Sequence, residues 1–185
     1  MPPSDSPRPW PVESSERVHE YPIFDVHHDR VRSPRTGDVH DFYIVEAPPA
    51  VVVVAITADD QVVMVEQYRH GIRETTLELP AGILDGDEPA DGGLRELREE
   101  TGYGVTHAEV LGVLEQNPAW ETVRVHVVYG EGAEREGEQE LDPGEDTRVR
   151  LVPRERLPSL VADGTISSAV AVAALYLAES RKRDA

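Results

Sequence analysis

The chain has 185 residues, 39% of them hydrophobic, and its 18 basic and 36 acidic side chains give a formal net charge of −18. This apolar content suits one globular domain, whereas the negative charge repels a phosphate backbone and excludes long nucleic acid as a partner. The chain has no cysteine, which excludes disulfides and thiol nucleophiles, and no apolar stretch approaches the roughly 18 residues of a membrane span, so we expect a cytoplasmic protein with no membrane partner.

The N-terminal quarter of the chain combines a polar segment with two strand patterns. Residues 1–20 are rich in proline, serine and charge, and we expect them to form a flexible tail. Strand-like runs follow at 21–31 and 41–47, and the Pro, Gly and Asp between them favour a hairpin turn near 33–38. We therefore expect antiparallel N-terminal strands at the start of a single domain that spans 21–185.

The rest of the chain carries further strand and helix patterns. A continuous β-branched run at 51–57 is typical of a strand buried on both faces, and the turn residues after it predict a second hairpin. Two helices are expected at the end, with Ser167 or Ser168 as the N-cap of the second. The other expected segments are strands at 62–68, 109–115, 122–130 and 147–153, a polar loop at 131–146, and helices at 154–164 and 167–180. This order predicts an α/β fold of the α+β type, with a mixed β-sheet sandwiched between helices.

The sequence LRELREETGY predicts a short helix with an acidic face. At about 100° per residue, Glu96, Glu99 and Glu100 fall on one side of this helix. Leu94 and Leu97 fall on the opposite side, which indicates a helix that packs on a core. The helix alone leaves two interpretations open: an exposed acidic surface, or a group of carboxylates that binds a cation.

The segment directly before this helix favours the cation. A strand-like run at 76–79 leads into Pro80, Ala81 and Gly82. The glycine allows a ligand to approach the backbone closely, and we expect the carbonyl of Ala81 to face the carboxylates. Carboxylate and carbonyl oxygens are the ligands that Mg²⁺ and Mn²⁺ prefer, and these ions commonly bridge to substrate phosphates.

These residues resemble the sequence box of the Nudix hydrolases, which runs Gly, five residues, Glu, seven residues and then R-E-U-x-E-E-x-G-U, where U is a bulky apolar residue. The second half matches position for position at Arg95, Glu96, Leu97, Glu99, Glu100, Gly102 and Tyr103. Gly82 begins the first half but lies one residue too close to Arg95. The first acid of the box is then either Glu88 or Asp87, and the similarity of GDEP to the usual turn of the family favours Asp87.

The resemblance extends to the ADP-ribose pyrophosphatase branch of this family, over nearly all of 21–180. It implies the Nudix fold and a hydrolysis, dependent on Mg²⁺ or Mn²⁺, of the pyrophosphate bond of ADP-ribose or a related nucleoside diphosphate sugar. A nucleoside monophosphate and a sugar phosphate would be released. The resemblance implies metal ligands at Ala81, Glu96, Glu99 and Glu100, catalytic roles for Glu99 and Glu100, and structural roles for Gly82, Arg95 and Gly102.

In the resembling branch the general base comes from an acidic loop that closes over the site. The candidates in this chain are Glu140, Asp142, Glu145 and Asp146. We favour Glu145, which lies two residues before the final strand, although Pro143 stands where the branch often carries a further acid. The alternative is that this segment is a solvated acidic linker with no part in the chemistry.

Substrate contacts are expected from three further side chains. Arg69 resembles the phosphate or ribose contact of the branch, and its alternative is a surface arginine at the end of a strand. Tyr68 and Trp120 are candidate stacking partners for a base, although aromatic side chains more often belong to a core. Arg95 is expected to orient the site by pairing with Glu99, four residues further on.

The resemblance also implies a homodimer, in which the N-terminal strands at 21–46 of one chain help to complete the site of the other. The alternatives to the leading function are another Nudix substrate, such as a dinucleoside polyphosphate or NADH, and a catalytically silent nucleotide-binding module. Loss of a helix carboxylate would mark a silent module, and all three are present. We therefore expect an enzyme that acts on a small-molecule nucleotide.

Overall fold

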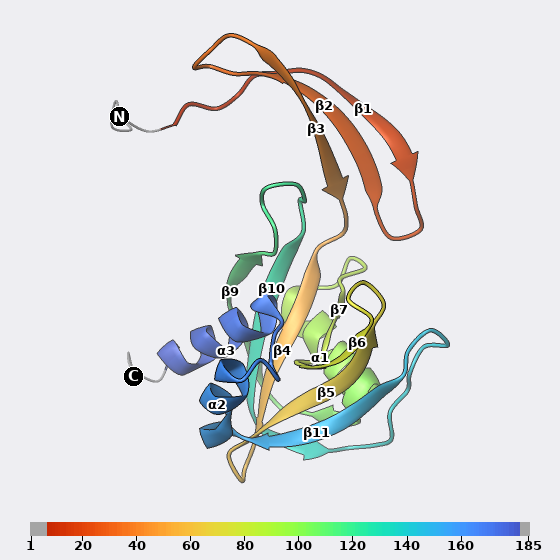
Figure 1. Cartoon of the computed structure of the whole chain (residues 1–185). Coiled ribbons are helices and arrows are strands. Elements are labelled where there is room, and N and C mark those ends of the chain that lie inside the picture. Colours follow the sequence, from red (N-terminus) through yellow and green to blue (C-terminus); the bar gives the residue numbers. More distant parts are fainter. Residues whose placement is uncertain (1–6, 182–185) are drawn as a thin grey trace. The chain divides into compact units, whose positions relative to one another are not determined.

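The computed structural model describes residues 7–181, which divide into two compact units (Figure 1). Unit 1 contains residues 7–48 and 117–123, and unit 2 contains residues 49–116 and 124–181. This division differs from the single domain predicted over 21–185. The strands within 21–48 pair with one another and with residues before them, so they form a sheet of their own.

Unit 1 is built on a three-stranded antiparallel sheet in the order β1-β2-β3. The strands are β1 (Val12–Glu20), β2 (Asp25–Arg32) and β3 (Val39–Glu46). The Ser33 N–H closes the turn between β2 and β3 by donating to the Asp38 carbonyl over 2.8 Å. The predicted hairpin and the antiparallel N-terminal strands are thus confirmed.

The flexible tail predicted over 1–20 is wrong for the residues that form β1. Residues 1–6 lie outside the described part of the chain, but β1 pairs with β2 from Val12 opposite Val31 to Glu20 opposite Asp25. All nine residues of β1 are exposed. Because neither face of this strand is buried, its sequence lacks the apolar alternation by which a strand is recognised.

The segment 117–123 completes unit 1. The Val45 N–H donates to the Trp120 carbonyl over 2.8 Å, and the Thr122 N–H donates to the Val45 carbonyl over 3.0 Å. The strand predicted at 122–130 therefore begins only at Arg124, where the chain continues into unit 2.

Unit 2 is built on a mixed sheet with β4 at its centre. β4 is parallel to β10 and antiparallel to β5 and β7, and the main strand order is β11-β5-β4-β10-β8. The strands are β4 (Ala50–Thr57), β5 (Gln61–Arg69), β6 (Glu74–Glu78), β7 (Ala81–Ile83), β8 (Tyr103–Gly104), β9 (Ala108–Glu115), β10 (Arg124–Arg135) and β11 (Thr147–Pro153). Residues 51–56 of β4 are all buried, as the continuous β-branched run predicts.

β10 is longer than the sequence predicts. Its last residues pair with β8, with Arg135 opposite Tyr103, so the polar loop expected from 131 begins only after Arg135. Ala133 is the one buried residue of this extension. A strand end with one buried residue among acidic and glycine neighbours has the composition of a loop, which explains the difference.

Helices cover both faces of the unit 2 sheet (Figure 1), which confirms the predicted sandwich. The helices are α1 (Pro89–Thr101), η1 (Arg154–Arg156), α2 (Leu157–Ala162) and α3 (Ala169–Arg181). Leu97 of α1 lies in a buried cluster with Val51 and Val53 of β4. Ser168 is the N-cap of α3, since its Oγ accepts a hydrogen bond from the Ala171 N–H over 3.3 Å. No helix within residues 7–181 is long and apolar enough to cross a membrane.

Glycines allow α1 to pack closely on its surroundings. A Cβ atom at Gly92 would lie 2.4 Å from Leu84 Cδ2, and one at Gly93 would lie 3.1 to 3.2 Å from the side chain of Val128. The helix ends at Gly102, which adopts a φ of +70°. These contacts fix the position of the acidic face of α1.

Candidate active site

β7 places a glycine against the acidic face of α1. A Cβ atom at Gly82 would lie 2.0 Å from the carboxyl carbon of Glu96 and 2.2 and 2.3 Å from its two oxygens. Because any side chain at position 82 would displace this carboxylate, the site requires glycine there. Pairing with β4 holds the strand in place, with Val51 opposite Gly82.

Two carboxylates of α1 are buried against β7. Glu100 is 4% exposed and Glu96 is 9% exposed, so the exposed acidic surface considered from the sequence is wrong for both. The Ala81 N–H donates to Glu100 Oε2 over 3.0 Å. Burial raises the pKa of Glu100 to about 8; the Ala81 amide opposes this shift, and the charges of Glu145 and Glu96 add to it. Burial also raises the pKa of Glu96, against the charge of Arg95.

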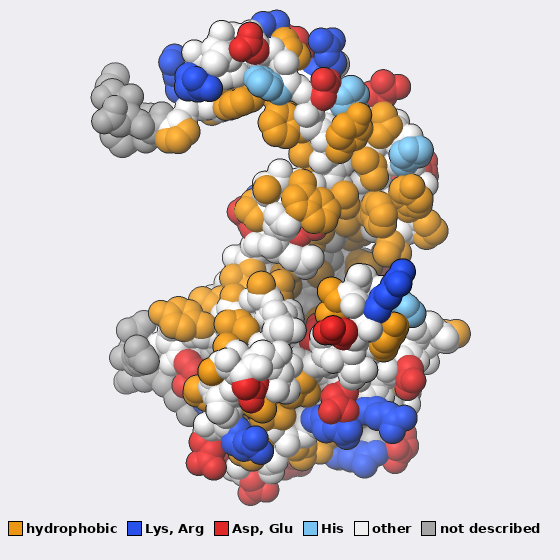
Figure 2. All heavy atoms as spheres, in the orientation of Figure 1, with side chains coloured by type: hydrophobic (Ala, Val, Ile, Leu, Met, Phe, Trp, Pro, Cys, Tyr) orange, Lys and Arg blue, Asp and Glu red, His pale blue; other side chains and the backbone are white. Residues whose placement is uncertain are grey.

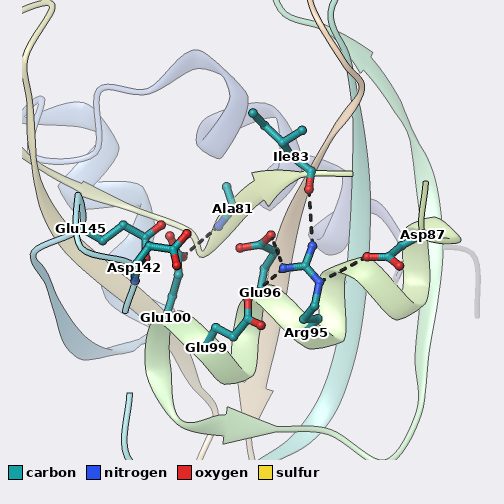
Figure 3. Close-up of polar contacts among 9 residues, drawn as sticks. All are labelled: Ala81, Ile83, Asp87, Arg95, Glu96, Glu99, Glu100, Asp142 and Glu145. Carbon is teal, nitrogen blue, oxygen red and sulfur yellow. Dashed lines mark hydrogen bonds and ion pairs between the residues drawn. The ribbon is translucent and has the colours of Figure 1, made fainter. Parts of the chain in front are cut away.

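Arg95 bridges the acids at the front of the helix (Figure 3). Its Nη1 lies 2.9 Å from Glu96 Oε1 and 2.8 Å from Glu99 Oε2, which confirms the predicted pair with Glu99. Its Nε donates to Asp87 Oδ2 over 3.2 Å. Of the two candidates for the first acid, Asp87 is therefore the one that contacts this group.

The loop between β10 and β11 is anchored to the end of α1. The Glu140 N–H donates to the Glu99 carbonyl over 2.8 Å. The side-chain amide of Gln139 donates to the Glu100 carbonyl over 2.6 Å and to the Thr147 hydroxyl over 3.0 Å. These bonds attach the loop both to the helix that carries the acids and to the first residue of β11.

The same loop brings further carboxylates to the site. The Asp142 N–H donates to Glu145 Oε2 over 3.0 Å, and Figure 3 shows both side chains beside Glu100. The residues that line a cavity of about 750 Å³ at this place are Gly82, Ile83, Asp85, Asp87, Arg95, Glu96, Glu99, Glu140, Asp142 and Glu145. Three of the four loop acids expected from the sequence thus line the cavity, and Asp146 does not.

A second cavity, of about 480 Å³, adjoins the first at Gly82. Arg69 lines it and is held by Glu78 through two parallel hydrogen bonds of 2.8 Å. The Thr76 hydroxyl donates to the same carboxylate over 2.6 Å. Burial acts to raise the pKa of Glu78, but the hydrogen bonds from Arg69 and Thr76 and the charge of Arg69 outweigh it and lower this pKa. The hydrogen bonds to Glu78 raise the pKa of Arg69, and the charge of Glu100 adds to this shift.

The two aromatic candidates are not core residues. Tyr68 is 48% exposed and meets His70 edge to face, with 5.3 Å between ring centroids. Trp120 is 46% exposed and belongs to unit 1. Neither residue lines the two cavities described above, and their contact with a base stays a prediction.

Sequence reasoning missed Glu78, Gln139 and Thr147. The β5–β6 register places Glu74, not Glu78, opposite Arg69, so hairpin pairing alone would have indicated the wrong partner. Gln139 is a neutral residue in an acidic segment, and this contrast is the one signal by which it could have been found.

Comparison with known proteins agrees with this geometry. The family model described as NUDIX domain matches residues 46–175. An ADP-ribose pyrophosphatase of Bacillus subtilis (strain 168) is 33% identical over 167 residues, which cover 89% of this chain and 90% of that protein. An ADP-ribose pyrophosphatase of Mycobacterium tuberculosis (strain ATCC 25618 / H37Rv) is 35% identical over 163 residues, which cover 86% and 78%. The crystal structure of an ADP compounds hydrolase has the same fold, with a TM-score of 0.85, 23% identity and 98% of both chains covered. The chain therefore belongs to the Nudix family.

Proposed function

We propose that this Nudix protein hydrolyses the pyrophosphate bond of ADP-ribose or a related nucleoside diphosphate sugar, releasing a nucleoside monophosphate and a sugar phosphate. The observation that carries the proposal is the burial of Glu96 and Glu100 beside Gly82, with Glu145 close enough for its charge to raise the pKa of both. The pyrophosphatase relatives support the substrate class.

The carboxylates of the site fit a divalent cation. The Arg95 guanidinium lies between Glu96 and Glu99, so these oxygens already accept a positive charge between them. Glu100 accepts a hydrogen bond from the Ala81 amide but has no arginine partner among the described residues. No three acidic or histidine side chains within residues 7–181 form a complete set of metal ligands. Mg²⁺ does not need one, because it usually keeps several waters and takes one or two carboxylates.

Glu96, Glu99, Glu100 and the Ala81 carbonyl are the proposed ligands. When bound, the cation offsets the negative charge of the pyrophosphate and lowers the pKa of a water. We propose Mg²⁺, with Mn²⁺ as the alternative, because both prefer oxygen ligands. The Ala81 N–H holds Glu100 in place through a hydrogen bond. We propose that the Ala81 carbonyl also binds the cation.

Glu145 is the proposed general base. In this reaction a water attacks one phosphorus of the pyrophosphate, and the bridging P–O bond breaks with its electron pair on the leaving phosphate. The proton of the water passes to the Glu145 carboxylate, which the Asp142 N–H orients. Arg95 positions Glu96 and Glu99 without taking part in the bond changes.

Arg69 is the proposed contact to a phosphate or ribose group of the substrate. Glu78, which also accepts a hydrogen bond from Thr76, holds the Arg69 guanidinium in one orientation, which lowers the entropy lost when a substrate binds. Tyr68 and Trp120 are proposed to stack on a base, since both rings are exposed.

The function is tested by an assay of ADP-ribose hydrolysis with Mg²⁺, with Mn²⁺ and with EDTA. We expect AMP and ribose phosphate only when a divalent metal is present. Glu100→Gln should lower kcat by at least about a hundredfold, since it removes a metal ligand but keeps the acceptor for the Ala81 amide. Glu88→Gln is the matched control, because Glu88 is exposed and makes no capping hydrogen bond, and it should keep its activity.

A panel of other substrates separates the alternatives. NADH, dinucleoside polyphosphates and further nucleoside diphosphate sugars are assayed under the same conditions. Preferential turnover of one of the first two would move the protein to another Nudix substrate class. Binding of ADP-ribose without turnover of any compound would contradict the proposal and indicate a silent nucleotide-binding module.

We further propose that the protein is a cytoplasmic homodimer that associates through the strands at 21–46. Unit 1 carries large exposed apolar side chains (Figure 2), among them Tyr21 at 48% and Ile23 at 62% in the connection between β1 and β2, and Tyr43 at 62% in β3. Such a group of exposed side chains is typical of an interface. Gel filtration with light scattering should give the mass of a dimer, and a strict monomer at micromolar concentration would contradict this proposal.

A further inference from the structure

A third cavity of unit 2, of about 410 Å³, has arginines and no carboxylate in its wall. The residues that line it are Thr101, Tyr103, Arg135, Gln139, Arg148, Val149, Arg150 and Leu151. It shares no lining residue with the two cavities of the proposed active site. Three arginines in one wall form a local excess of positive charge, although the chain as a whole has twice as many acidic as basic side chains.

Neighbouring carboxylates leave part of this charge uncompensated. Arg135 pairs with Glu138 over 2.7 Å, and Arg150 pairs with Glu66 over 2.5 Å. Arg148 has no carboxylate within ion-pair distance in the described part of the chain. The Glu138 side chain is 90% exposed, and such a surface ion pair contributes about 1 kcal/mol or less, so an anion can displace it readily.

The cavity follows the open edge of β11, which pairs with β5 on its other side. The carbonyls of Thr147 and Val149 accept hydrogen bonds from the side chains of Gln139 and Arg150, over 3.4 and 3.3 Å. These two residues therefore direct their backbone groups away from β5. Because the N–H and the carbonyl of one residue point to the same side of a strand, the Val149 N–H also faces the open edge.

We propose that this cavity binds a phosphomonoester dianion. Arginine presents a planar fork of donors that matches phosphate oxygens, and the Val149 N–H adds a backbone donor beside them. The basic side chains over β11 can be followed in Figure 2. The volume exceeds that of a phosphate alone and leaves room for an attached sugar or nucleoside.

The cavity is connected to the acidic site through Gln139. This residue lines the cavity and donates to the carbonyl of Glu100 and to the hydroxyl of Thr147. A phosphate that contacts both Arg135 and Arg148 joins the two strands between which the loop with Glu145 runs, and it restricts that loop. Any effect of this restriction on turnover rests on the proposed function, because Glu145 lies in the loop. The binding of phosphate and the restriction of the loop do not rest on it.

The experiment is a titration of the ¹⁵N-labelled, EDTA-treated protein with inorganic phosphate, AMP and ribose 5-phosphate at constant ionic strength, followed by amide NMR shifts. We expect the largest shifts at Tyr103, Gln139 and Val149. Arg148→Gln should raise the Kd about tenfold, the loss of one charge-assisted contact. Arg156→Gln is the matched control: Arg156 is exposed, lies outside the wall and changes the charge equally, so the Kd should not change.

Two results would overturn the site. Equal weakening by the two substitutions would reduce the binding to general charge attraction, and binding of inorganic phosphate without either ester would exclude a phosphomonoester. Arg148 is exposed and makes no ion pair with the described residues, so its variant should fold, which its own spectrum checks.

Hydrogen exchange tests the restriction of the loop. Amides of residues 139–146 should exchange more slowly with phosphate bound, in the unsubstituted protein and in Arg156→Gln. If phosphate binds and the exchange of these amides does not change, the proposed restriction of the loop is wrong. Neither metal nor substrate is present, so failure here leaves the proposed hydrolysis untouched, and a lack of hydrolysis leaves this site untouched.

Discussion

The pKa values of two carboxylates of unit 2, the buried Glu100 and the partly buried Glu78, are shifted in opposite directions. Burial raises the pKa of Glu100 to about 8, because the Ala81 amide and the charge of Arg69 oppose it only in part. Burial acts in the same direction on Glu78, but the fork of Arg69 and the hydroxyl of Thr76 outweigh it, and the pKa of Glu78 is lowered. The difference shows that burial alone does not decide whether a carboxylate is charged, and that a neighbouring cation can outweigh it.

The contrast indicates different tasks for the two acids. Arg69 already neutralises Glu78, so this pair acts as a fixed part of the cavity wall. Glu100 lies instead among the charges of Glu96 and Glu145 and gains most from an added cation. Perturbed acids of this kind are concentrated at functional sites.

The largest expected effect is that of Gly82→Ala, which disturbs the group of carboxylates to which Glu100 belongs. The added Cβ atom would lie 2.0 Å from the carboxyl carbon of Glu96, so the carboxylate must move. We expect the free energy of unfolding to fall by about 1–3 kcal/mol from overpacking. Hydrolysis of ADP-ribose should fall by about a hundredfold from the misplaced acid.

The control for this substitution is Gly71→Ala, where a Cβ atom meets nothing within 4 Å. Denaturant unfolding and the ADP-ribose assay are measured on both variants. Near-normal activity of Gly82→Ala would show that Glu96 does not need its place beside β7.

A direct test of the comparison measures unfolding of Glu78→Gln and Glu100→Gln in metal-free protein near pH 7.5. Glu78→Gln should lower the free energy of unfolding by about 1–2 kcal/mol, a value reduced because the Arg69 side chain is 43% exposed. Glu100→Gln should leave the free energy of unfolding unchanged or raise it. The side-chain oxygen of the glutamine still accepts the hydrogen bond from the Ala81 N–H, and no charge is buried. Glu74→Gln, on the exposed end of β6, is the control. Equal losses in the first two variants would refute the contrast.

Most of unit 2 could be predicted from the sequence because its elements carry their own patterns. The run at 51–56 is buried on both faces, and Leu97 packs on the sheet as the helical period indicates. β1 could not be predicted, because an exposed strand has no apolar alternation. Its structure depends on pairing with β2, which is a property of the sheet and not of the segment.

The same distinction applies to the site. Glu96, Glu99 and Glu100 could be predicted because spacing within one helix fixes the face on which they lie. The role of Gln139 could not, because it contacts Glu100 across 39 positions of the sequence and only tertiary packing brings them together. Glu78 likewise joins Arg69 across nine positions and outside the hairpin register.

The pH dependence of stability sharpens the comparison on the side of Glu78. The folded-state pKa of this carboxylate lies below its ordinary value of 4.5, so its ionised form stabilises the fold. This contribution is complete above the ordinary value and is lost as the pH falls through the lowered one. The difference in Tm between the unsubstituted protein and Glu78→Gln should therefore shrink below about pH 4.5. A difference that stays constant from neutral to acidic pH would contradict the lowered pKa.

The smallest expected effect separates the two partners of Glu78. The Thr76 hydroxyl lies 2.6 Å from Glu78 Oε1 and 3.2 Å from the Gln67 carbonyl, and the residue is 7% exposed. Thr76→Val keeps the shape and removes the hydroxyl, so the free energy of unfolding should fall by about 1 kcal/mol while the Arg69 fork remains. If the hydroxyl acts through Glu78, the double variant with Glu78→Gln should lose less than the sum of the single losses. Strict additivity in this double-mutant cycle would instead show that Thr76 stabilises the protein through Gln67, and Arg69 alone would then account for the lowered pKa of Glu78.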